Sequence, residues 1–496
     1  MLSEDLRALI TENFIHIPTE QQALVLDMWC RFLLEDSSES IFLMKGYAGT
    51  GKTSLVGALV KTLRMLHQKV VLLAPTGRAA KVMGSYAGYP AGTIHRHIYR
   101  QRTFGEERFM PAPNLTKHAL YIVDEASMIA NEGLSGSIFG DGRLLDDLIQ
   151  YVYSGDGCRL ILIGDTAQLP PVGETVSPAL NENMLSGYGL NLRKVQLTEV
   201  VRQANTSGIL WNATMLRQCL CMERLKGLPK LNISFPDVSV IHGSELIEAL
   251  ERSYWQCGKE GTIVITRSNK RANVYNQGIR SRILDYDCEL GGGDMVMVSK
   301  NKYLHGKDLI ANGEMGIIRR IRNERELYGF RFADATITLI DRIATDSSDT
   351  QETETEQESH TELDTVVLLD TLHSEAPALT REQQQTLFLK VCEDYPELHN
   401  KKDLYKAVKE DRHYGALQIK YAYAVTCHKA QGGQWEDVYV DQGYLPEETP
   451  TEDYLRWLYT AITRATSHVY LVNWPEEQTC NNSPADNGRC TELSFS

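Results

Sequence analysis

A glycine-rich stretch near the N-terminus has the residue types and spacing that hold a phosphate. Residues 46–53 read GYAGTGKT, the pattern of a phosphate-binding loop. Backbone N–H groups of such a loop point inward around the phosphates, Lys52 can reach the β- and γ-phosphates, and Thr53 offers a hydroxyl to Mg²⁺. The apolar run 41–45 before the loop and the helical pattern after it supply the strand and the positive helix end that this chemistry requires. The predicted nucleotide-binding set is Gly46, Ala48, Gly49, Thr50, Gly51, Lys52, Thr53 and Ser54.

Two later strand ends carry the polar groups that a hydrolytic site needs. The run LYIVDEAS places Asp124 and Glu125 directly after an apolar strand. We expect Asp124 to hold Mg²⁺ and Glu125 to orient or deprotonate the attacking water. The run LILIGDTAQLPPVG places Gln168 after another apolar strand, where it could sense the γ-phosphate. These groups are predicted to meet, because ligands bind at the carboxyl edge of open α/β sheets.

The elements that position these residues form two similar sets along the chain. Apolar runs without polar alternation recur, and helical patterns separate many of them, which is typical of buried parallel strands in α/β units. A short hairpin and a β-rich region with a charged helical stretch, 381–412, interrupt the two sets. The predicted division is a first core of 1–96 and 118–200, a hairpin of 97–117, a second core of 201–293 and 415–475, an insertion of 294–414 with an acidic loop of 341–364, and a polar tail of 476–496.

The composition is that of an ordinary globular protein with one unusual segment. The chain has 496 residues, 42% hydrophobic and 23% charged, with a net charge of −14. Nine acidic residues and one arginine give the segment 341–364 a charge of −8 and leave −6 on the rest, so the global charge does not exclude a basic groove. We expect this segment to be a flexible spacer or a docking site for a protein partner.

Cysteines, apolar runs and the N-terminus favour a cytoplasmic location. The ten cysteines form no CxxC pair, and the closest two, Cys219 and Cys221, are a weak metal signal, so we expect reduced thiols. No apolar run reaches the roughly 18 residues of a membrane span. The N-terminal residues MLSEDLRALITENF are acidic and do not resemble a secretory signal.

The ordered series of motifs resembles the superfamily 1 DNA helicases of type 1B, which move 5′ to 3′. The resemblance covers roughly residues 19–474, is strongest for the RecD-like and phage Dda-like branch, and is more distant for the Pif-like branch. The interval between Glu125 and Gln168 shows no clear version of the extra Pif signature. The motifs are TEQQ, GYAGTGKT, APTGRAA, TIH, VDEASM, GDTAQLPPVG, LTEVVRQ, GDMVM with NGEMG, VTCHKAQGGQW and LYTAITRA.

The resemblance implies a fold, ligands and residue roles. It implies two tandem RecA-like cores, a hairpin that acts as a wedge through Phe104, and an SH3-like insertion. ATP with Mg²⁺ would bind between the cores, Gln22 would read the adenine (with Gln21 beside it as the alternative register), and Arg202 and Arg464 would reach the γ-phosphate. The expected partner is single-stranded DNA and its junctions with duplex, bound by a monomeric motor. The implied DNA contacts are Pro75, Thr76, Thr93, His95, Phe104, Thr426, His428 and Lys429.

Three other functions fit parts of the sequence. An RNA helicase would share every motif, because the sequence shows no contact that tests for a 2′-hydroxyl. A non-catalytic regulatory subunit would have lost residues of the set Lys52, Asp124, Glu125, Gln168 and Arg464, all of which are present. A small-molecule kinase would have one phosphate-loop core and no late LYTAITRA motif.

Overall fold

The structure is a computed structural model of the 496-residue chain. It describes residues 2–35, 39–101, 109–133, 142–200, 207–222, 227–303, 309–343, 360–445 and 451–481. The chain divides into two compact units. Unit 1 comprises residues 1–75, 82–246 and 430–496, and unit 2 comprises 76–81 and 247–429.

Unit 1 contains a six-stranded sheet in the order β3-β2-β6-β7-β1-β8, with every neighbouring pair parallel. The central strands are continuous apolar runs because helices cover both faces of such a sheet. Asn191 begins β8, which lies at the edge and is more exposed than the central strands. The strands are β1 (Ser40–Gly46), β2 (Val70–Ala74), β3 (Ala91–Thr93), β6 (Leu120–Val123), β7 (Arg159–Gly164) and β8 (Asn191–Leu197).

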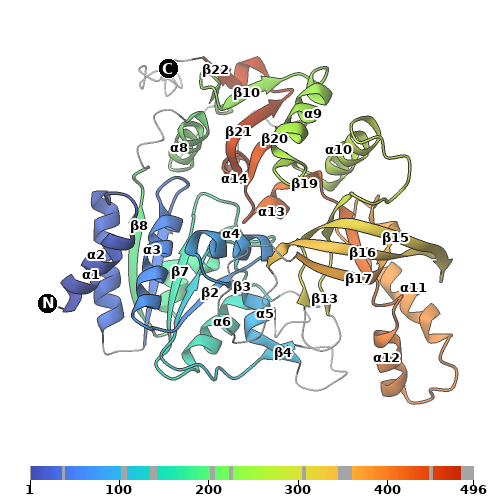
Figure 1. The fold of residues 1–496 in the computed structure, drawn as a ribbon, viewed down its shortest axis with the longest axis horizontal. Helices are drawn as coiled ribbons and strands as arrows, with labels where there is room; N and C mark the ends of the chain where they lie inside the picture. The colour runs from blue at the N-terminus through green and yellow to red at the C-terminus, as the bar shows by residue number, and fades with distance from the viewer. Residues whose placement is uncertain are drawn as a thin grey trace, which may run out of the picture. The chain divides into compact units, whose positions relative to one another are not determined.

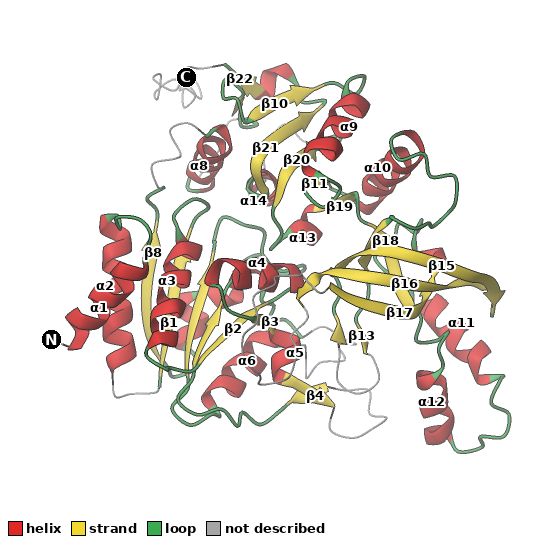
Figure 2. Ribbon diagram, viewed as in Figure 1, coloured by secondary structure: helices red, strands yellow, loops and turns green. Residues whose placement is uncertain are grey.

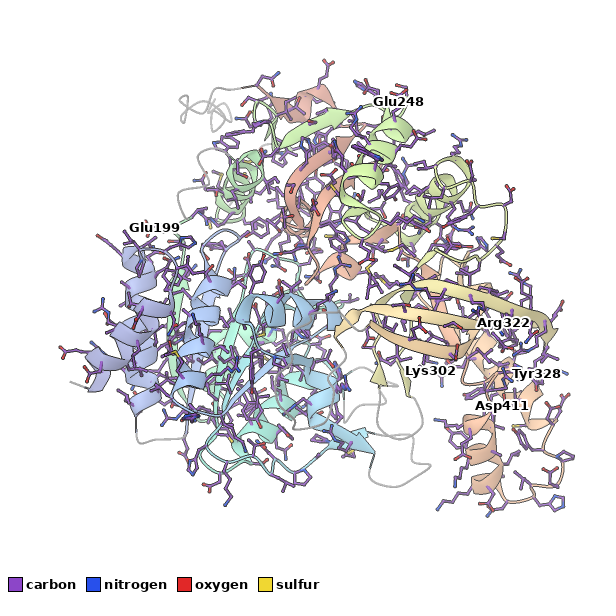
Figure 3. All side chains as sticks on the ribbon, viewed as in Figure 1. Glu199, Glu248, Lys302, Arg322, Tyr328 and Asp411 are labelled. Carbon is purple, nitrogen blue, oxygen red and sulfur yellow. The ribbon has the colours of Figure 1, made fainter. Side chains whose placement is uncertain are left out.

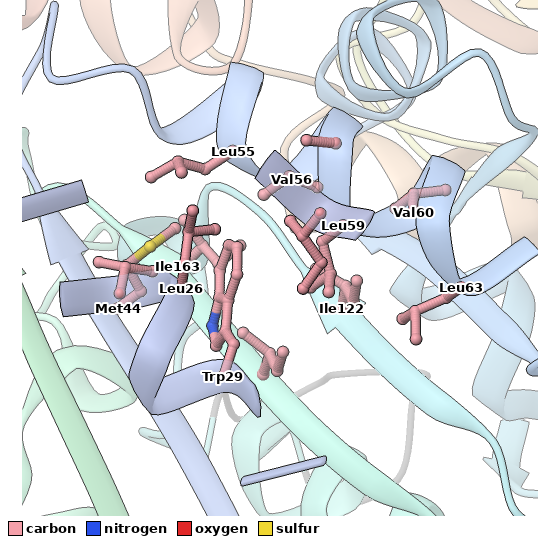
Figure 4. Close-up of a cluster of buried hydrophobic side chains, with 14 of the residues drawn as sticks. Leu26, Trp29, Met44, Leu55, Val56, Leu59, Val60, Leu63, Ile122 and Ile163 are labelled. Atoms are coloured by element: carbon pink, nitrogen blue, oxygen red, sulfur yellow. The ribbon is translucent and has the colours of Figure 1, made fainter. Parts of the chain in front are cut away.

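One face of this sheet is covered by the first three helices (Figure 1). In Figure 4, Trp29 of α2 and Leu59 of α3 lie against Ile122 and Ile163 from two sheet strands. Thr19 caps α2, since its hydroxyl accepts a hydrogen bond from the Gln22 amide while the Gln22 side chain accepts from the Thr19 amide. The helices of this region are α1 (Leu2–Asn13), α2 (Glu20–Leu34), α3 (Lys52–Met65), α4 (Gly77–Ala87), α5 (Ile94–Ile98), α6 (Leu144–Tyr153) and α7 (Glu182–Ser186).

A second group of parallel strands in unit 1 comes from the later part of the chain. Strand β21 (Ala465–Val472) pairs in parallel with both β10 (Val238–Ile241) and β20 (Trp435–Asp441). Helix α14 (Glu452–Ile462) packs against α8 (Gly208–Leu220). Two further short pairs in the unit are β9 (Leu231–Asn232) with β22 (Thr479–Cys480) and β4 (Tyr99–Gln101) with β5 (Phe109–Pro111).

Unit 2 combines two parallel strands with a closed β-barrel (Figure 2). Strand β11 (Thr262–Thr266) pairs in parallel with β19 (Ala424–Thr426), beside α10 (Asn269–Arg282). The barrel strands are β12 (Met295–Val298), β15 (Met315–Leu327), β16 (Phe330–Ile343), β17 (His360–Leu368) and β18 (Leu417–Tyr421). Other elements here are β13 (Lys302–Tyr303), β14 (Leu309–Ile310), α9 (Leu246–Cys257) and α13 (Cys427–Ala430).

A helical pair, α11 (Arg381–Cys392) and α12 (Lys401–Glu410), packs on one end of the barrel. Leu387, Val391 and Val408 from the helices join Phe330 and Phe332 of β16 in one apolar cluster. Tyr328 and Asp411 lie near this junction (Figure 3). The predicted helical stretch 381–412 is therefore two helices.

The structure confirms the α/β class and the parallel-sheet cores, while the nature of the two insertions stays a prediction. The hairpin prediction coincides with the antiparallel pair β4 and β5, but residues 102–108 lie outside the described part of the chain. The acidic loop is shorter than predicted at both ends, because β16 runs to Ile343 and β17 begins at His360. In the described part of the chain, no helix is long and apolar enough to cross a membrane.

Candidate nucleotide site at the sheet edge

Three neighbouring strands of unit 1 end where the predicted catalytic groups begin. In the sheet, Ile161 of β7 is paired with Ile122 of β6 on one side and with Phe42 of β1 on the other. The phosphate-binding loop follows β1, the carboxylate pair follows β6, and the loop with Gln168 follows β7. Because the strands are parallel, all three loops lie at one edge of the sheet, as predicted.

The phosphate-binding loop has the backbone that its glycines were expected to allow. Gly49 and Gly51 have φ of 75° and 79°, values that favour glycine, and Gly51 precedes the first residue of α3. A Cβ on Gly46 would lie 2.8 Å from Cδ of Lys52, so a larger residue here would push the lysine side chain from its path across the loop. Lys52 Nζ donates to the carbonyl oxygens of Gly46 (2.7 Å) and Tyr47 (2.8 Å). The ammonium group is thus held over the loop, next to the position that phosphates would occupy.

Asp124 and Glu125 have different surroundings although they are adjacent. Burial, and then the charge of Glu125, raise the pKa of Asp124 to about 6, while Lys52 lowers it. Asp124 Oδ1 accepts a hydrogen bond from the Glu125 amide (2.8 Å). Glu125 has a φ of 51°, a left-handed conformation that costs energy in a residue other than glycine and that recurs at functional sites.

The donor set at this edge fits Mg²⁺ bound together with a nucleotide. Thr53 and Asp124 offer one hydroxyl and one carboxylate, and Mg²⁺ is commonly held by one or two carboxylates together with phosphate and water oxygens. Within the described residues, no group of three or more His, Cys, Asp or Glu side chains could hold a metal ion by itself. The residues present therefore suit a metal that arrives with phosphates.

Arg464 reaches the carboxylate pair from the far end of the chain. It lies two residues after α14, is 4% exposed, and places Nη1 3.8 Å from Glu125 Oε1. Its guanidinium is also fixed by hydrogen bonds from Nε to the Thr460 carbonyl (3.1 Å) and from Nη1 to the Gly433 carbonyl (3.2 Å). A permanently charged group held by two backbone carbonyls thus lies beside the candidate base, and the contact of Arg464 with the γ-phosphate stays a prediction.

Gln168 is buried with an unused acceptor. Its side chain is 5% exposed, and its Oε1 has no hydrogen-bond partner among the described residues. A buried polar atom without a partner is costly and calls for an explanation. A water at the sheet edge could donate the missing hydrogen bond, and the role of Gln168 near the γ-phosphate stays a prediction.

The structure adds residues that the sequence analysis did not single out. Helix α14 holds the Gln168 loop through three side chains: Arg456 donates to the Gln168 carbonyl (3.2 Å), Thr460 Oγ1 accepts from the Leu169 amide (3.0 Å), and Tyr459 donates to Asp165 (2.6 Å). Asp165, Tyr459 and Thr460 lie inside motifs used for the prediction, but nothing in those motifs indicated that they touch.

Gln22 and Gln21 both contact the loops around the phosphate site. Gln22 is buried, and its Nε2 donates to the Thr50 carbonyl (3.1 Å). Gln21 Oε1 accepts hydrogen bonds from the amides of Thr198 (2.7 Å) and Glu199 (3.0 Å). Gln22 is thus bound to the phosphate loop and Gln21 to the segment after β8. Both contacts are within the protein, and the adenine contact of Gln22 stays a prediction.

The predicted DNA-contacting residues are distributed over both units, and several have a structural role. In unit 1, Thr93 caps α5, since its hydroxyl accepts from the Arg96 amide (3.2 Å), and burial lowers the pKa of His95 to about 4. In unit 2, Thr76 Oγ1 accepts from the Ala79 amide (3.2 Å). These contacts do not test DNA binding. Of the remaining predicted residues, Pro75 ends the first segment of unit 1, Thr426, His428 and Lys429 lie at the end of β19 and in α13 of unit 2, and Phe104 and Arg202 lie outside the described residues.

Comparisons with known proteins agree with the order of the motifs. Residues 31–218 match an AAA domain family, and residues 421–472 match the UvrD-like helicase C-terminal domain. The chain is 32% identical to the ATP-dependent RecD2 DNA helicase of Deinococcus radiodurans, over 62% of this chain and 39% of that protein. It is 29% identical to the ATP-dependent DNA helicase dda of Enterobacteria phage T4, over 32% of this chain and 34% of that protein. The matches span well under two thirds of these relatives' length.

A solved structure of similar extent is that of a Pif1 helicase from Bacteroides in complex with ADP-AlF3 and single-stranded DNA. It is 16% identical, covers 95% of this chain and 96% of that one, and has a TM-score of 0.43. The sequence matches and the ordered motifs point the same way. The chain is similar to superfamily 1 helicases of the RecD-like and Pif-like kinds.

Proposed function

We propose that this chain is an ATP-dependent DNA helicase that moves 5′ to 3′ on single-stranded DNA and unwinds duplex DNA. The observation that carries the proposal is the approach of Arg464 to Glu125 (3.8 Å) at the edge that also bears the phosphate loop. A hydrolytic site completed by a residue from the last quarter of the chain couples nucleotide state to the arrangement of the chain's parts. That coupling is what a motor requires.

Each residue at the edge has a role in hydrolysis. Mg²⁺, held by Thr53 and Asp124, would neutralise charge on the β- and γ-phosphate oxygens. Glu125 accepts the proton of the attacking water, and Gln168 positions that water with its unused Oε1. Lys52 and Arg464 stabilise the charge on the transferred phosphoryl group, and Arg202 shares this role.

The DNA path and the insertions are part of the same proposal. The predicted contacts are backbone contacts, so affinity for single strands should fall as salt rises. Phe104 and Phe109 at the hairpin would stack on the first base pair of the junction, worth about 1–3 kcal/mol per base. The barrel of unit 2 would be the SH3-like insertion, and the acidic segment a spacer within a monomeric motor. The proposed DNA contacts are Pro75, Thr76, Thr93, His95, Phe104, Thr426, His428 and Lys429.

Strand displacement on two partial duplexes tests the proposal. One duplex carries a 5′ tail and the other a 3′ tail, and both are assayed with ATP and Mg²⁺. Unwinding of the 5′-tailed substrate alone is the expected result. Unwinding from 3′ tails alone would contradict the proposed direction, and hydrolysis stimulated only by RNA oligonucleotides would favour the RNA helicase.

A further inference from the structure

The hydroxyl of Tyr459 connects the phosphate loop to the Gln168 loop. It accepts a hydrogen bond from the Ala48 amide (2.9 Å) and donates one to Asp165 Oδ2 (2.6 Å). Tyr459 and Asp165 are each 1% exposed, so water does not compete for these contacts. One side chain of α14 thus contacts two of the three loops that form the candidate site.

The direction of the two hydrogen bonds is fixed by chemistry. The Ala48 amide can only donate, so the phenol oxygen accepts from it. An ionised Asp165 can only accept, so the phenol proton points to Asp165. The other oxygen of Asp165 accepts from the Ala167 amide (2.9 Å). The phenol therefore has both of its functions occupied, and neither loop can move without breaking or stretching a buried hydrogen bond.

The same residue is also connected to Arg464. The hydroxyl of Thr463 donates to the backbone carbonyl of Tyr459 (2.8 Å), and Nη2 of Arg464 donates to Thr463 Oγ1 (3.3 Å). A continuous path thus runs from the Ala48 amide through Tyr459, from its hydroxyl to its backbone carbonyl, and on through the Thr463 hydroxyl. It ends at the guanidinium of Arg464, beside Glu125. The other contacts of α14 at this edge, from Arg456 and Thr460, reach the Gln168 loop.

We infer that Tyr459 is a positioning residue that makes the placement of Arg464 depend on the state of the phosphate loop. Phosphates bind to the amides of this loop, so their arrival and departure change its backbone, and the hydroxyl of Tyr459 transmits that change to α14. The inference rests on the proposed function and deepens it. It assigns a role in turnover to a residue that contacts neither phosphate nor water.

Replacing Tyr459 by Phe removes the hydroxyl and keeps the ring. The matched control is Tyr454→Phe on the same helix, because Tyr454 is also buried and donates its hydroxyl proton to Gln442 Oε1 (2.7 Å), away from the phosphate loop. Thermal unfolding of each full-length variant is measured first. The kcat and KM of ATP hydrolysis are then measured without DNA and with saturating single-stranded DNA.

We expect Tyr459→Phe to lower DNA-stimulated kcat about tenfold, equivalent to about 1.4 kcal/mol, with KM for ATP within threefold of the parent. Tyr454→Phe should keep kcat and KM. Equal losses of kcat in the two variants, or a raised KM with normal kcat for Tyr459→Phe, would overturn the inference. If the parent protein itself does not hydrolyse ATP, the proposed function fails instead, so the two failures are distinguishable.

A second variant covers the case in which Tyr459→Phe does not fold. Asp165→Asn removes the negative charge that accepts the hydrogen bond of the Tyr459 hydroxyl. We expect this variant to lower kcat to a similar extent. Where both single variants fold, the double variant should lose no more than either one, because the two residues act through one hydrogen bond. Full kcat in Asp165→Asn, or multiplied losses in the double variant, would show that Tyr459 does not act through this contact.

Discussion

Two buried tyrosine–aspartate pairs, one in each unit, share a local design and differ in their surroundings. In unit 1, Tyr459 accepts from the Ala48 amide (2.9 Å) and donates to Asp165 (2.6 Å). In unit 2, Tyr423 accepts from the Met295 amide (3.0 Å) and donates to Asp294 (2.9 Å). Both tyrosines have a pKa raised by burial and by the charge of their aspartate.

The two pairs differ in whether a cationic side chain binds the aspartate. Arg280 binds Asp294 through two hydrogen bonds, from Nε (2.8 Å) and Nη2 (2.9 Å), so this carboxylate is neutralised in the interior. Among the residues that the structure describes, Asp165 forms no ion pair with a lysine or arginine. Burial raises the pKa of this carboxyl, and the charge of Lys52 opposes that rise without cancelling it. The pair of unit 2 fixes the joint between α10 and the barrel, whereas the aspartate of the unit 1 pair has no ion-pair partner among the described residues and lies in the loop after β7. Perturbed ionisable groups of this second kind mark functional sites.

The largest effect is expected when the cation of the phosphate loop in unit 1 is removed. Lys52→Ala removes the cation over the phosphate loop and should reduce ATP hydrolysis at least about 10³-fold, because charge stabilisation in the transition state is lost while the core is unchanged. Phosphate release and thermal unfolding are measured together. Lys45→Ala is the control, since Lys45 lies on β1 and pairs with Glu182 (2.7 Å). Normal turnover by Lys52→Ala would end the phosphate-loop assignment.

A nearly equal effect is expected when the late arginine is removed. Arg464→Ala should lower DNA-stimulated kcat by about 10³-fold or more, while nucleotide affinity stays within a few-fold. Equilibrium binding of a labelled nucleotide and single-turnover hydrolysis measure the two quantities separately. Arg464→Lys keeps the charge and loses the planar fork, so it should recover only part of the rate. Should Arg464→Ala turn over normally, the C-terminal segment would not complete the site.

The third prediction compares the two aspartates in stability. Asp294→Asn leaves Arg280 buried without its counter-charge and should lower the free energy of unfolding by about 3–5 kcal/mol. Asp165→Asn removes a buried charge that lacks an ion-pair partner, so its cost at pH 7 should be below about 1 kcal/mol. Urea unfolding monitored by circular dichroism at pH 7 measures both. Equal losses of unfolding free energy in the two variants would mean that the ion pair with Arg280 does not distinguish Asp294 from Asp165.

The same pair of variants predicts a pH dependence. The folded-state pKa of Asp165 is raised above 3.8, so the folded chain holds this proton more tightly than the unfolded chain does. Its contribution to stability is fully present below pH 3.8 and is lost as the pH rises through the folded pKa. Asp165→Asn should therefore flatten the fall in stability over this range relative to the parent. Curves that stay parallel would show that Asp165 does not titrate in this way.

The smallest effect is expected in the acidic segment. Deleting residues 345–358 removes sequence between β16 and β17 and leaves the paired residues His360 and Ile343 in place. A segment with few apolar residues buries little surface, so hydrolysis and unwinding should stay within about twofold of the parent. Steady-state ATPase and strand displacement measure this. Loss of either activity in a folded deletion variant would assign the segment more than a spacer role.

The groups at the sheet edge were predictable because their signals are local. Continuous apolar runs mark the parallel strands, and the residues directly after Gly46, Val123 and Gly164 must then share one edge. The contact between Tyr459 and Asp165 was not predictable, since 294 residues separate them and no spacing rule joins two motifs. Capping was only the alternative interpretation of Thr76, and it was not predicted for Thr93, because a threonine before a helix gives the same signal whether it binds a ligand or an amide.

The hydrogen bond between Ala48 and Tyr459 also bears on biosynthesis, because 411 residues separate its two ends. Ribosomes add about 5–20 residues per second, so the phosphate loop of each nascent chain waits about 20–80 s for its partner. Contacts of such sequence separation form late and slow the folding of the unit that contains them. The loops after β1 and β7 would meanwhile lack their hydrogen bonds to α14. This interval is when chaperones would be needed most, and a pause in translation before residue 459 would lengthen it.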